Sequence, residues 1–501
     1  MFKSKNHLGL FTQKSAEKFC VKKISKKNTA LYVHIPFCFS KCDYCDFFSV
    51  ACQGKIPDSY IDALCSELDF YVQKYQIKNF STVYIGGGTP SLLNSFQIRK
   101  LLEHILSKSK SKPKEITFEA NPESITEEKL FALEKSGVNR ISLGIQSFNE
   151  KSLQSVSRHC SAKIALEAIE IVKKTWHGIL NLDIIAGLPF LSDEQFIDGL
   201  KKIISCNPEH ISMYTLTVEE ETPLFKKISD GLQFNSDFAD RQWLMGFDLL
   251  KKNGYFQYEV SNFCKKGFES AHNMTYWTQG DYLGIGSGAT GSLWFDKISS
   301  DDFDDFVCTE NVAGGFVAAE NDAGAFSKKN PLRTSLEQIE QKSESADLKN
   351  FCGLRWINTK NIDEYIKFWT EDFAGTEKLS VNTEDSAGTE KLAVSTEDLL
   401  IAAMPREIEK IDLKTREFEY IMLGFRTIYG IDFKRYKKLF KNLNPYFGNL
   451  KNRLEKSSVW NDFVSKNYAY LKKSKFKKNI CAALFDSGLL FLNELLLDLI
   501  D

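Results

Sequence analysis

The 501-residue sequence lacks any stretch of about 18 consecutive apolar residues, the length that a membrane-spanning helix needs. Even the apolar segment GLLFLNELLLDLI near the C-terminus is interrupted by Asn493, Glu494 and Asp498. A net charge is also nearly absent, because 65 lysines and arginines face 66 aspartates and glutamates. Such a balanced chain exerts no global attraction on nucleic acid or on an anionic membrane. We therefore expect a cytoplasmic protein with no nucleic-acid partner and no transmembrane segment.

The first 28 residues contain no arginine and no apolar run of about 7–15 residues, so we expect no secretory signal peptide. Eight lysines face a single acid, Glu17, in this segment. A strongly charged segment with few apolar residues cannot bury enough surface to order itself. We expect a disordered basic arm over residues 1–28.

Closely spaced cysteines are scarce. The chain has twelve cysteines, but only Cys38, Cys42 and Cys45 have the spacing of metal ligands. In a reducing compartment, isolated cysteines are usually small buried side chains. A fourth cysteine is missing from the stretch HIPFCFSKCDYCDFF, which continues with Phe47 and Phe48.

From residue 31 to about residue 250, short β-branched or apolar runs alternate with helical patterns. The runs are LYVHI (31–35), TVYIGG (82–87), ITFEA (116–120), RISLGIQ (140–146), NLDIIAG (181–187) and HISMYTLT (210–217). Strands that are apolar in both directions and are joined by helices predict parallel pairing with right-handed crossovers. Six such units fit either a partial barrel or an open doubly wound sheet, and periodicity alone does not choose between them.

Polar residues lie at or just beyond the C-terminal ends of the predicted strands. In strand order they are Cys38, the GGGTP segment, Glu119 with Asn121, Gln146, Asp183, and Tyr214 with Thr215. Function in barrels and in open α/β sheets gathers at that edge. The sequence therefore predicts a binding site at one edge of the sheet.

The regular alternation ends near residue 295. Residues 296–350 are acidic, rich in small residues and poorly periodic. Residues 371–410 belong to a near-repeat with a 13-residue period, in which TED recurs at Thr370, Thr383 and Thr396. A repeat this short and polar cannot bury a face of its own, so we expect two solvated insertions. From Arg416 a basic and apolar helical pattern resumes and predicts a small, mainly helical C-terminal domain.

Three thiols in a C-x3-C-x2-C pattern fit two kinds of metal centre. Zinc prefers four tetrahedral ligands, and His34 could complete a Cys3His set. A [4Fe–4S] cluster on three cysteines would keep one iron open for a small molecule. The spacing alone admits both, since either metal would draw the thiols to thiolates.

The glycines of YIGGGTPS (84–91) allow backbone amides to approach an anion closely, although a tight strand-to-helix turn explains them nearly as well. Glu119, Gln146, Arg158 and Asp183 lie at or near successive strand ends. Each alone could be a solvated charge or a helix cap. Together they could hold a zwitterionic amino acid and a ribose.

Several motifs of the chain occur together in a known family. LYVHIPFC, GGGTPS, FEANPES, RISLGIQSF, SRH and LDIIAGLP follow one another between residues 31 and 295, and LRWINT (354–359) and EFEYIMLGFRTIYGID (417–432) come later. This order resembles the radical S-adenosylmethionine superfamily, and within it the oxygen-independent coproporphyrinogen III oxidase-like group. The resemblance implies a (β/α)6 partial TIM-type barrel followed by a smaller, mainly helical HemN-like C-terminal domain. The expected divisions are a basic arm (1–28), a radical S-adenosylmethionine core (29–295), a low-complexity insertion (296–350), a family-like segment (351–370), a repeat insertion (371–410) and the C-terminal domain (411–501).

The resemblance also implies the cofactors. A [4Fe–4S] cluster would bind Cys38, Cys42 and Cys45, and S-adenosylmethionine would chelate its open iron. The residues expected to bind S-adenosylmethionine by position are Tyr32, Gly87, Gly88, Thr89, Glu119, Gln146, Arg158, Asp183 and Thr215. The cofactor would supply the radical chemistry, and the protein would orient it and exclude water.

Two activities occur in this group. The dehydrogenase makes protoporphyrinogen IX from coproporphyrinogen III, and its cluster motif continues with a cysteine where this chain has Phe47. The heme-chaperone branch has C-D-F there and an H-N-x-x-Y-W stretch, which this chain matches with HNMTYW (272–277). The resemblance is closest to that branch, which implies heme, heme-accepting proteins and an electron donor as partners.

His272, Tyr276 and Trp277 are the candidate heme contacts, because an imidazole can ligate heme iron and aromatic faces can pack on a porphyrin. The alternative for His272 is a hydrogen-bonded structural role. The turn GSGATGS (286–292) departs from a GPGAHS-like turn of the family. Two alternative functions stay open: a coproporphyrinogen dehydrogenase acting on a porphyrinogen, and a zinc-stabilised binding protein.

Overall fold

The structure is a computed structural model that describes residues 28–52, 55–295, 351–373, 404–440, 450–473, 480–484, 495–496 and 499. Residues 1–27, the insertion 296–350 and nearly all of the 13-residue repeat lie outside the described residues. The disorder predicted for the basic arm and the solvated state predicted for the two insertions therefore stay predictions.

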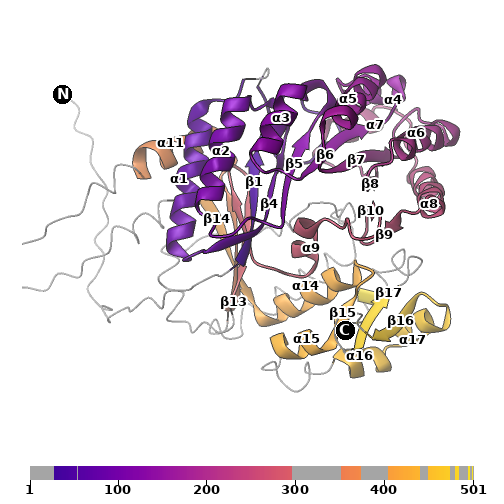
Figure 1. Cartoon of the computed structure of the whole chain (residues 1–501). Helices are drawn as coiled ribbons and strands as arrows, with labels where there is room; N and C mark the ends of the chain where they lie inside the picture. Colours follow the sequence, from indigo (N-terminus) through magenta and orange to yellow (C-terminus); the bar gives the residue numbers. More distant parts are fainter. Residues whose placement is uncertain are drawn as a thin grey trace, which may run out of the picture.

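Six parallel strands form the centre of the molecule, as the sequence predicts (Figure 1). They are β1 (Asn28–Ile35), β4 (Asn79–Gly87), β5 (Glu115–Ala120), β6 (Arg140–Gln146), β7 (Ile179–Ala186) and β8 (His210–Thr215). They pair in chain order, for example with Tyr32 opposite Tyr84 and Phe118 opposite Ile141. Consecutive parallel neighbours joined by helices are the arrangement of a (β/α)6 partial barrel.

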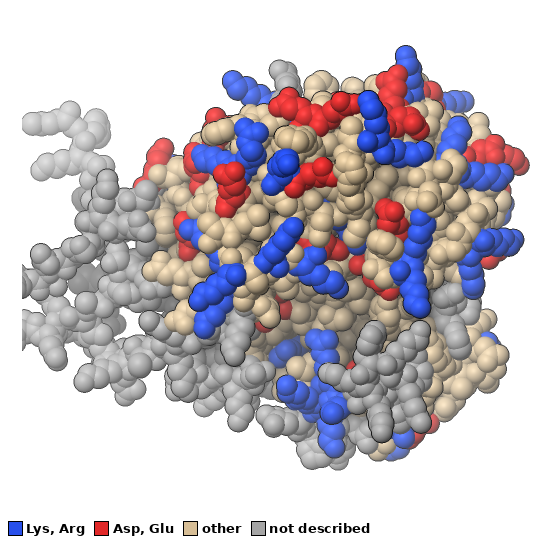
Figure 2. All heavy atoms as spheres, viewed as in Figure 1, with Lys and Arg blue, Asp and Glu red and all other residues tan. Residues whose placement is uncertain are grey.

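Helices connect these strands and cover one face of the sheet (Figure 1). They are α1 (Asp58–Lys74), α2 (Ser95–Ser107), α3 (Glu127–Lys135), α4 (Glu150–Ser155), α5 (Ala162–Thr175), α6 (Asp193–Ser205), α7 (Pro223–Ser229) and α8 (Ser236–Lys252). Polar side chains begin many of them; Asn94 and Ser192 each form a reciprocal capping box that satisfies the first amides of α2 and α6. Basic and acidic side chains alternate over the helices in Figure 2, which fits the balanced composition.

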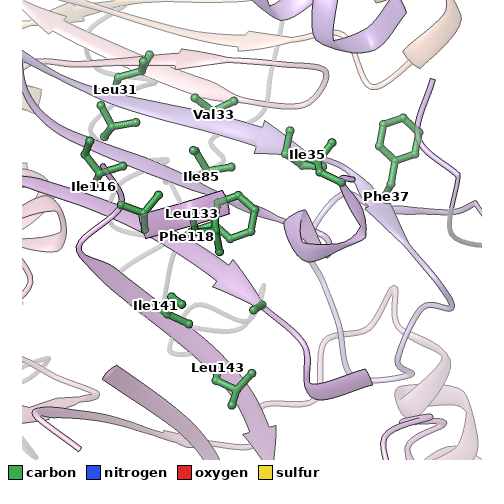
Figure 3. Close-up of a cluster of buried hydrophobic side chains, with 14 of the residues drawn as sticks. Leu31, Val33, Ile35, Phe37, Ile85, Ile116, Phe118, Leu133, Ile141 and Leu143 are labelled. Atoms are coloured by element: carbon green, nitrogen blue, oxygen red, sulfur yellow. The ribbon is translucent and has the colours of Figure 1, made fainter. Parts of the chain in front are cut away.

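The strands are apolar on only one face, so the prediction of strands that are apolar in both directions is wrong. The helix-facing residues form the core, and Figure 3 shows Leu31, Val33, Ile35, Ile85, Ile116, Phe118, Ile141 and Leu143 together with Leu133 of α3. The alternate residues are polar or aromatic and line the concave side: Tyr32, His34, Thr82, Tyr84, Glu115, Thr117, Glu119, Arg140, Ser142, Asn181, Asp183, His210 and Ser212. A concave side lined with polar groups suits a ligand site rather than a solid core.

The sheet extends beyond the six strands to twelve in total. On one side β11 (Tyr282–Ile285) pairs parallel with β1, followed by antiparallel β12 (Thr290–Trp294), β13 (Phe351–Asn358) and β14 (Arg406–Asp412). On the other side β10 (Asn262–Cys264) and β9 (Phe256–Gln257) follow β8. Because Trp294 pairs with Gly353, the strands on either side of the insertion 296–350 are neighbours in the sheet.

The C-terminal part packs a second hydrophobic core below the sheet (Figure 1). Its elements are α14 (Leu413–Phe425), β15 (Ile431–Asp432), α15 (Phe433–Phe440), α16 (Leu450–Lys456), α17 (Ser458–Ser465), β16 (Ala469–Lys473) and β17 (Ile480–Leu484). The helical content agrees with the prediction, and a three-stranded antiparallel sheet of order β15–β17–β16 is added to it. None of the helices in the described part of the chain is long and apolar enough to cross a membrane.

Candidate functional site

The three closely spaced cysteines lie in a loop at the C-terminal end of β1. Cys38 closes the short strand β2 (Phe37–Cys38), which pairs with β3 (Val50–Ala51). This pairing, and a 3.0 Å bond from the Cys52 amide to the Cys38 carbonyl, joins the two ends of the loop. Cys38 and Cys42 are buried, Cys45 is partly buried, and all three are free thiols.

The thiols lie close enough to affect one another. Burial, followed by the nearby Cys42 and Cys38 thiols, raises the pKa of Cys45 to about 12. The pKa of Cys38 is raised by burial too, against a hydrogen bond that the Thr89 hydroxyl donates to its sulfur over 3.6 Å. Three grouped thiols, of which Cys38 and Cys45 have raised pKa values, fit a metal centre, because a bound cation would stabilise all three thiolates.

The arrangement does not fit a Cys3His zinc site. The Nε2–H of His34 donates to the Phe48 carbonyl at 3.0 Å, and Nδ1 then accepts from the Tyr32 hydroxyl at 2.9 Å. Both ring nitrogens are thus engaged, and burial lowers the pKa of His34 to about 4. Within the described ranges, no three His, Cys, Asp or Glu side chains gather around a single ion. A [4Fe–4S] cluster makes a different demand, since each cysteine binds a different iron.

The GGGTP segment (86–90), which begins in the last two residues of β4, forms a tight turn rather than an open anion nest. The amides of Gly87, Gly88 and Thr89 donate to Glu119 Oε2 (3.0 Å), to the Ile35 carbonyl (2.9 Å) and to the Phe37 carbonyl (2.7 Å). Gly87 has φ +113°, and a Cβ there would lie 2.5 Å from the His34 ring. These glycines therefore let β4 approach the beginning of the cysteine loop closely.

Arg158 connects the cysteine loop to the ends of the neighbouring strands. It donates to Cys42 Sγ at 3.7 Å, to Asn121 Oδ1 at 2.8 Å and to the Gly144 carbonyl at 2.8 Å. Burial alone would lower its pKa, but Tyr44, Cys42 and Glu123 outweigh burial and hold the pKa above its ordinary value. The guanidinium is therefore a fixed positive charge beside the thiols.

Asn121, which the sequence analysis places at the edge of the sheet, is missing from the residues expected to bind S-adenosylmethionine. Its amide nitrogen donates to Thr89 Oγ1 at 3.1 Å while its carbonyl oxygen accepts from Arg158, so it joins two predicted site residues. Its position at a strand end, in the stretch FEANPES, was the available signal. Gln146 lies beside this group: β6 bulges between Gly144 and Gln146, and Gln146 has φ +66°.

The two carboxylates of the predicted set point into the concave side. Glu119 accepts from the Tyr84 hydroxyl at 2.6 Å in addition to the Gly87 amide. Asp183 accepts from Asn181 Nδ2 at 2.7 Å and from Ser142, and burial raises its pKa to about 6. Both therefore belong to a partly buried group of polar side chains on the concave side of the sheet. Thr215 lies at the end of β8, where it pairs with Ala186. It takes no part in the hydrogen bonds of Glu119 and Asp183 described above.

The HNMTYW stretch forms α9 (Ala271–Trp277), which lies between β4 and α14 on the concave side (Figure 1). His272 is fully buried, with Nδ1 2.9 Å from Thr82 Oγ1 and Nε2 2.7 Å from the Tyr276 hydroxyl. Its amide donates to Glu115, and burial lowers its pKa to about 4. Both imidazole nitrogens are thus engaged, and Trp277 is buried as well.

Comparison with known proteins agrees with the architecture. The model of the radical SAM superfamily matches residues 32–203. Among solved structures, coproporphyrinogen III oxidase (HemN) from Escherichia coli superposes with a TM-score of 0.62 over 96% of this chain and 91% of that chain. At 17% sequence identity this likeness shows the fold alone. Barrel and cysteine loop together define a radical S-adenosylmethionine protein, a class that carries a [4Fe–4S] cluster and S-adenosylmethionine.

Sequence relatives narrow the class. The chain is 42% identical over 267 residues to the heme chaperone HemW of Buchnera aphidicola from Acyrthosiphon pisum, covering 53% of this chain and 70% of that protein. It is 39% identical over 268 residues to HemW of Escherichia coli K12, with the same coverage. A mouse protein, radical S-adenosyl methionine domain-containing protein 1, mitochondrial, is 36% identical over 52% of this chain and 60% of its own length. The chain belongs to the HemW family.

Proposed function

We propose that this protein is a heme chaperone, which binds heme and delivers it to acceptor proteins. The observation that carries the proposal is the identity to bacterial HemW proteins, 42% over 70% of the length of one of them. Phe47, in the position where the dehydrogenases resembled by the sequence have a further cysteine, supports it. The likeness to coproporphyrinogen III oxidase extends over more of the chain, but at 17% identity it does not carry an activity.

In this proposal Cys38, Cys42 and Cys45 hold a [4Fe–4S] cluster whose open iron takes S-adenosylmethionine. The pair supplies one-electron reductive chemistry when bound. Arg158 supplies a fixed positive charge beside Cys42, and Thr89 donates to Cys38. Both interactions favour thiolates over thiols.

The amino acid and ribose groups of S-adenosylmethionine would be surrounded by Tyr32, Glu119, Gln146 and Asp183. Its methionine end would lie against Gly87, Gly88 and Thr89, and Thr215 would lie at the edge of the site. Support comes from Glu119 and Asp183, which present carboxylates on the polar concave side of the sheet. Such groups pair with an ammonium and with hydroxyls. A chain of hydrogen bonds runs from Cys42 through Arg158 and Asn121 to Thr89. These bonds would connect this part of the site to the cluster.

We also propose that the protein works in a reducing compartment, the cytoplasm, with an electron donor and heme-accepting proteins as partners. Support comes from the described cysteines, which are free thiols, Cys65 and Cys206 included. Thiols of this kind persist where glutathione and thioredoxin keep them reduced.

The test is an anaerobic incubation of the cluster-loaded protein with S-adenosylmethionine, reductant and coproporphyrinogen III. A chaperone is expected to yield no protoporphyrinogen IX above a control without S-adenosylmethionine. Formation of protoporphyrinogen IX over several turnovers would replace the proposal with the dehydrogenase activity. Metal analysis in the same preparation is expected to give about four non-heme irons per chain and no stoichiometric zinc.

A further inference from the structure

A heme chaperone needs a group that holds the heme iron, and the described histidines differ sharply in their availability. His34, His210 and His272 are buried with both ring nitrogens engaged. His104 and His177 are paired with Asp69 and Glu134. His159 is exposed, and the contact that the structure gives it is with an aromatic ring, Phe39.

His159 is held firmly although it is exposed. Ser157 has φ +55°, so the chain turns sharply just before it, and Arg158 then points inward to Cys42 and Asn121. The Ser157 hydroxyl donates to Asp43 Oδ2 at 2.7 Å, and the Asp43 amide donates to the Val156 carbonyl at 3.0 Å. The three residues that precede His159 therefore fix its segment to the cysteine loop.

Phe39 belongs to the cysteine loop, and its ring lies beside His159. Its ring is 53% exposed, and its centroid is 6.1 Å from that of the His159 imidazole, at an interplanar angle of 74°. An axial imidazole stands perpendicular to the porphyrin that it ligates, so a ring at this inclination can lie nearly parallel to that porphyrin and pack on it. Phe47 of the same loop is 41% exposed and adds apolar surface, and the exposed Lys41 adds a cation of the kind that pairs with a propionate.

We infer that His159, rather than His272, is the ligand of the heme iron, and that the heme packs on Phe39 at the outer face of the cysteine loop. The inference rests on the proposed heme-chaperone function and gives it a site. A neutral imidazole is an ordinary ligand of heme iron, and an exposed one binds without first breaking hydrogen bonds. Ligation by His272 would break its bonds to both Thr82 and Tyr276.

This placement brings the heme next to the cofactor site. Arg158, the residue before His159, donates to the sulfur of Cys42. A heme on His159 would therefore lie over the loop that is expected to hold the cluster, on the side away from the core.

The test is a titration of ferric heme into the anaerobically reconstituted, cluster-loaded full-length protein, followed by Soret absorbance and heme electron paramagnetic resonance. His159→Ala is expected to raise the heme dissociation constant at least about tenfold and to abolish the spectrum of a nitrogen-ligated heme. The matched control is His177→Ala, which removes another exposed histidine and is expected to leave both unchanged. In His159→Gly, added imidazole is expected to restore the nitrogen-ligated spectrum, and circular dichroism with the non-heme iron content reports whether each variant is folded and loaded.

Unchanged affinity and spectrum in His159→Ala would overturn the assignment while leaving the heme-chaperone proposal intact. Loss of the nitrogen-ligated spectrum in folded His272→Ala, with His159→Ala unaffected, would move the ligand to α9. Absence of saturable heme binding by the unsubstituted protein would remove the proposed function and the assignment with it.

Discussion

Replacing Glu67 by glutamine is expected to change how the stability of this protein depends on pH. Glu67 lies on α1 and is fully buried, where it accepts hydrogen bonds from the Gly286 amide (2.8 Å), Asn358 Nδ2 (2.7 Å) and the Tyr365 hydroxyl (2.5 Å). Burial raises its pKa from 4.5 to about 7 despite these bonds. It therefore connects α1 to the turn after β11 and to α11 (Ile362–Lys367).

The turn held by Glu67 supports the cysteine loop. A Cβ on Gly286 would lie 2.5 Å from the His34 carbonyl oxygen, and a Cβ on Gly288 would lie 2.4 Å from the Phe48 ring. The GSGATGS turn, which departs from the family pattern, thus packs on the end of β1 and on the residue that His34 binds. Because Glu67 accepts from the Gly286 amide, a change in its charge affects how this turn packs against His34 and Phe48.

The magnitude follows from proton linkage. Because the folded state binds the Glu67 proton more tightly than the unfolded state, protonation stabilises the fold below about pH 4.5, and this contribution is lost as the pH rises through 7. Between pH 5 and pH 8 the loss amounts to about 2–3 kcal/mol. A glutamine side chain does not titrate, so relative to wild type the Glu67→Gln variant is expected to gain about 2–3 kcal/mol of stability over that interval.

The assay is urea unfolding of the wild type and both variants at pH 5 and pH 8, with Glu103→Gln as the control at an exposed position of α2. The wild-type-minus-variant difference removes the contributions of other titrating groups, such as Asp183. A difference for Glu67→Gln that is the same at both pH values within about 0.5 kcal/mol would refute the reasoning. A pH-dependent difference of similar size in Glu103→Gln would refute it as well.

Further predictions concern the cysteine loop. Arg158→Met removes the donor to Cys42, Asn121 and Gly144, so it is expected to destabilise the protein by about 2–3 kcal/mol and to lower the non-heme iron retained after anaerobic gel filtration; full retention would contradict this role. Gly87→Ala is expected to unfold at a lower urea concentration than Gly231→Ala. The two glycines have similar positive φ (+113° and +107°), but of the two only a Cβ at Gly87 would meet another group, the His34 ring at 2.5 Å. Equal unfolding midpoints would show that the contact is relieved at no cost. Phe47→Cys changes an exposed side chain and is expected to alter stability by less than about 0.5 kcal/mol and to leave the iron content unchanged, with extra iron per chain as the contrary result.

The six central strands could be predicted because each is a short run rich in β-branched residues between capped helices. The remaining strands could not, because their pairing is between distant segments: β11 lies beside β1 although some 250 residues separate them, and β13 pairs with β12 across residues 296–350. Nothing in the local pattern of residues 406–412 indicates that β14 completes the large sheet. The polar face of the strands does show in the sequence as an alternation of apolar and polar residues, for example in ITFEA, which the prediction of strands apolar on both faces did not use.

The site could be predicted to the level of which residues meet, and less well to the level of what each does. Arg158 and Thr89 do lie beside the cysteines, because strand ends converge at one edge of the sheet. The roles of Asn121 and His34 depend on three-dimensional hydrogen bonds that spacing does not reveal. The HNMTYW motif makes His272 a candidate heme contact. The motif does not predict that His272 and Trp277 are buried, because their burial follows from the packing of α9 against β4.

The central claim is that this chain carries heme, and heme titration of the cluster-loaded protein tests it most directly. The account predicts saturable binding of one heme per chain, with a Soret band typical of histidine ligation and with the non-heme iron retained. Transfer of that heme to an apo-acceptor protein should follow, without any conversion of coproporphyrinogen III. Binding that fails to saturate, or a Soret band no different from that of heme with an unrelated protein, would contradict the account.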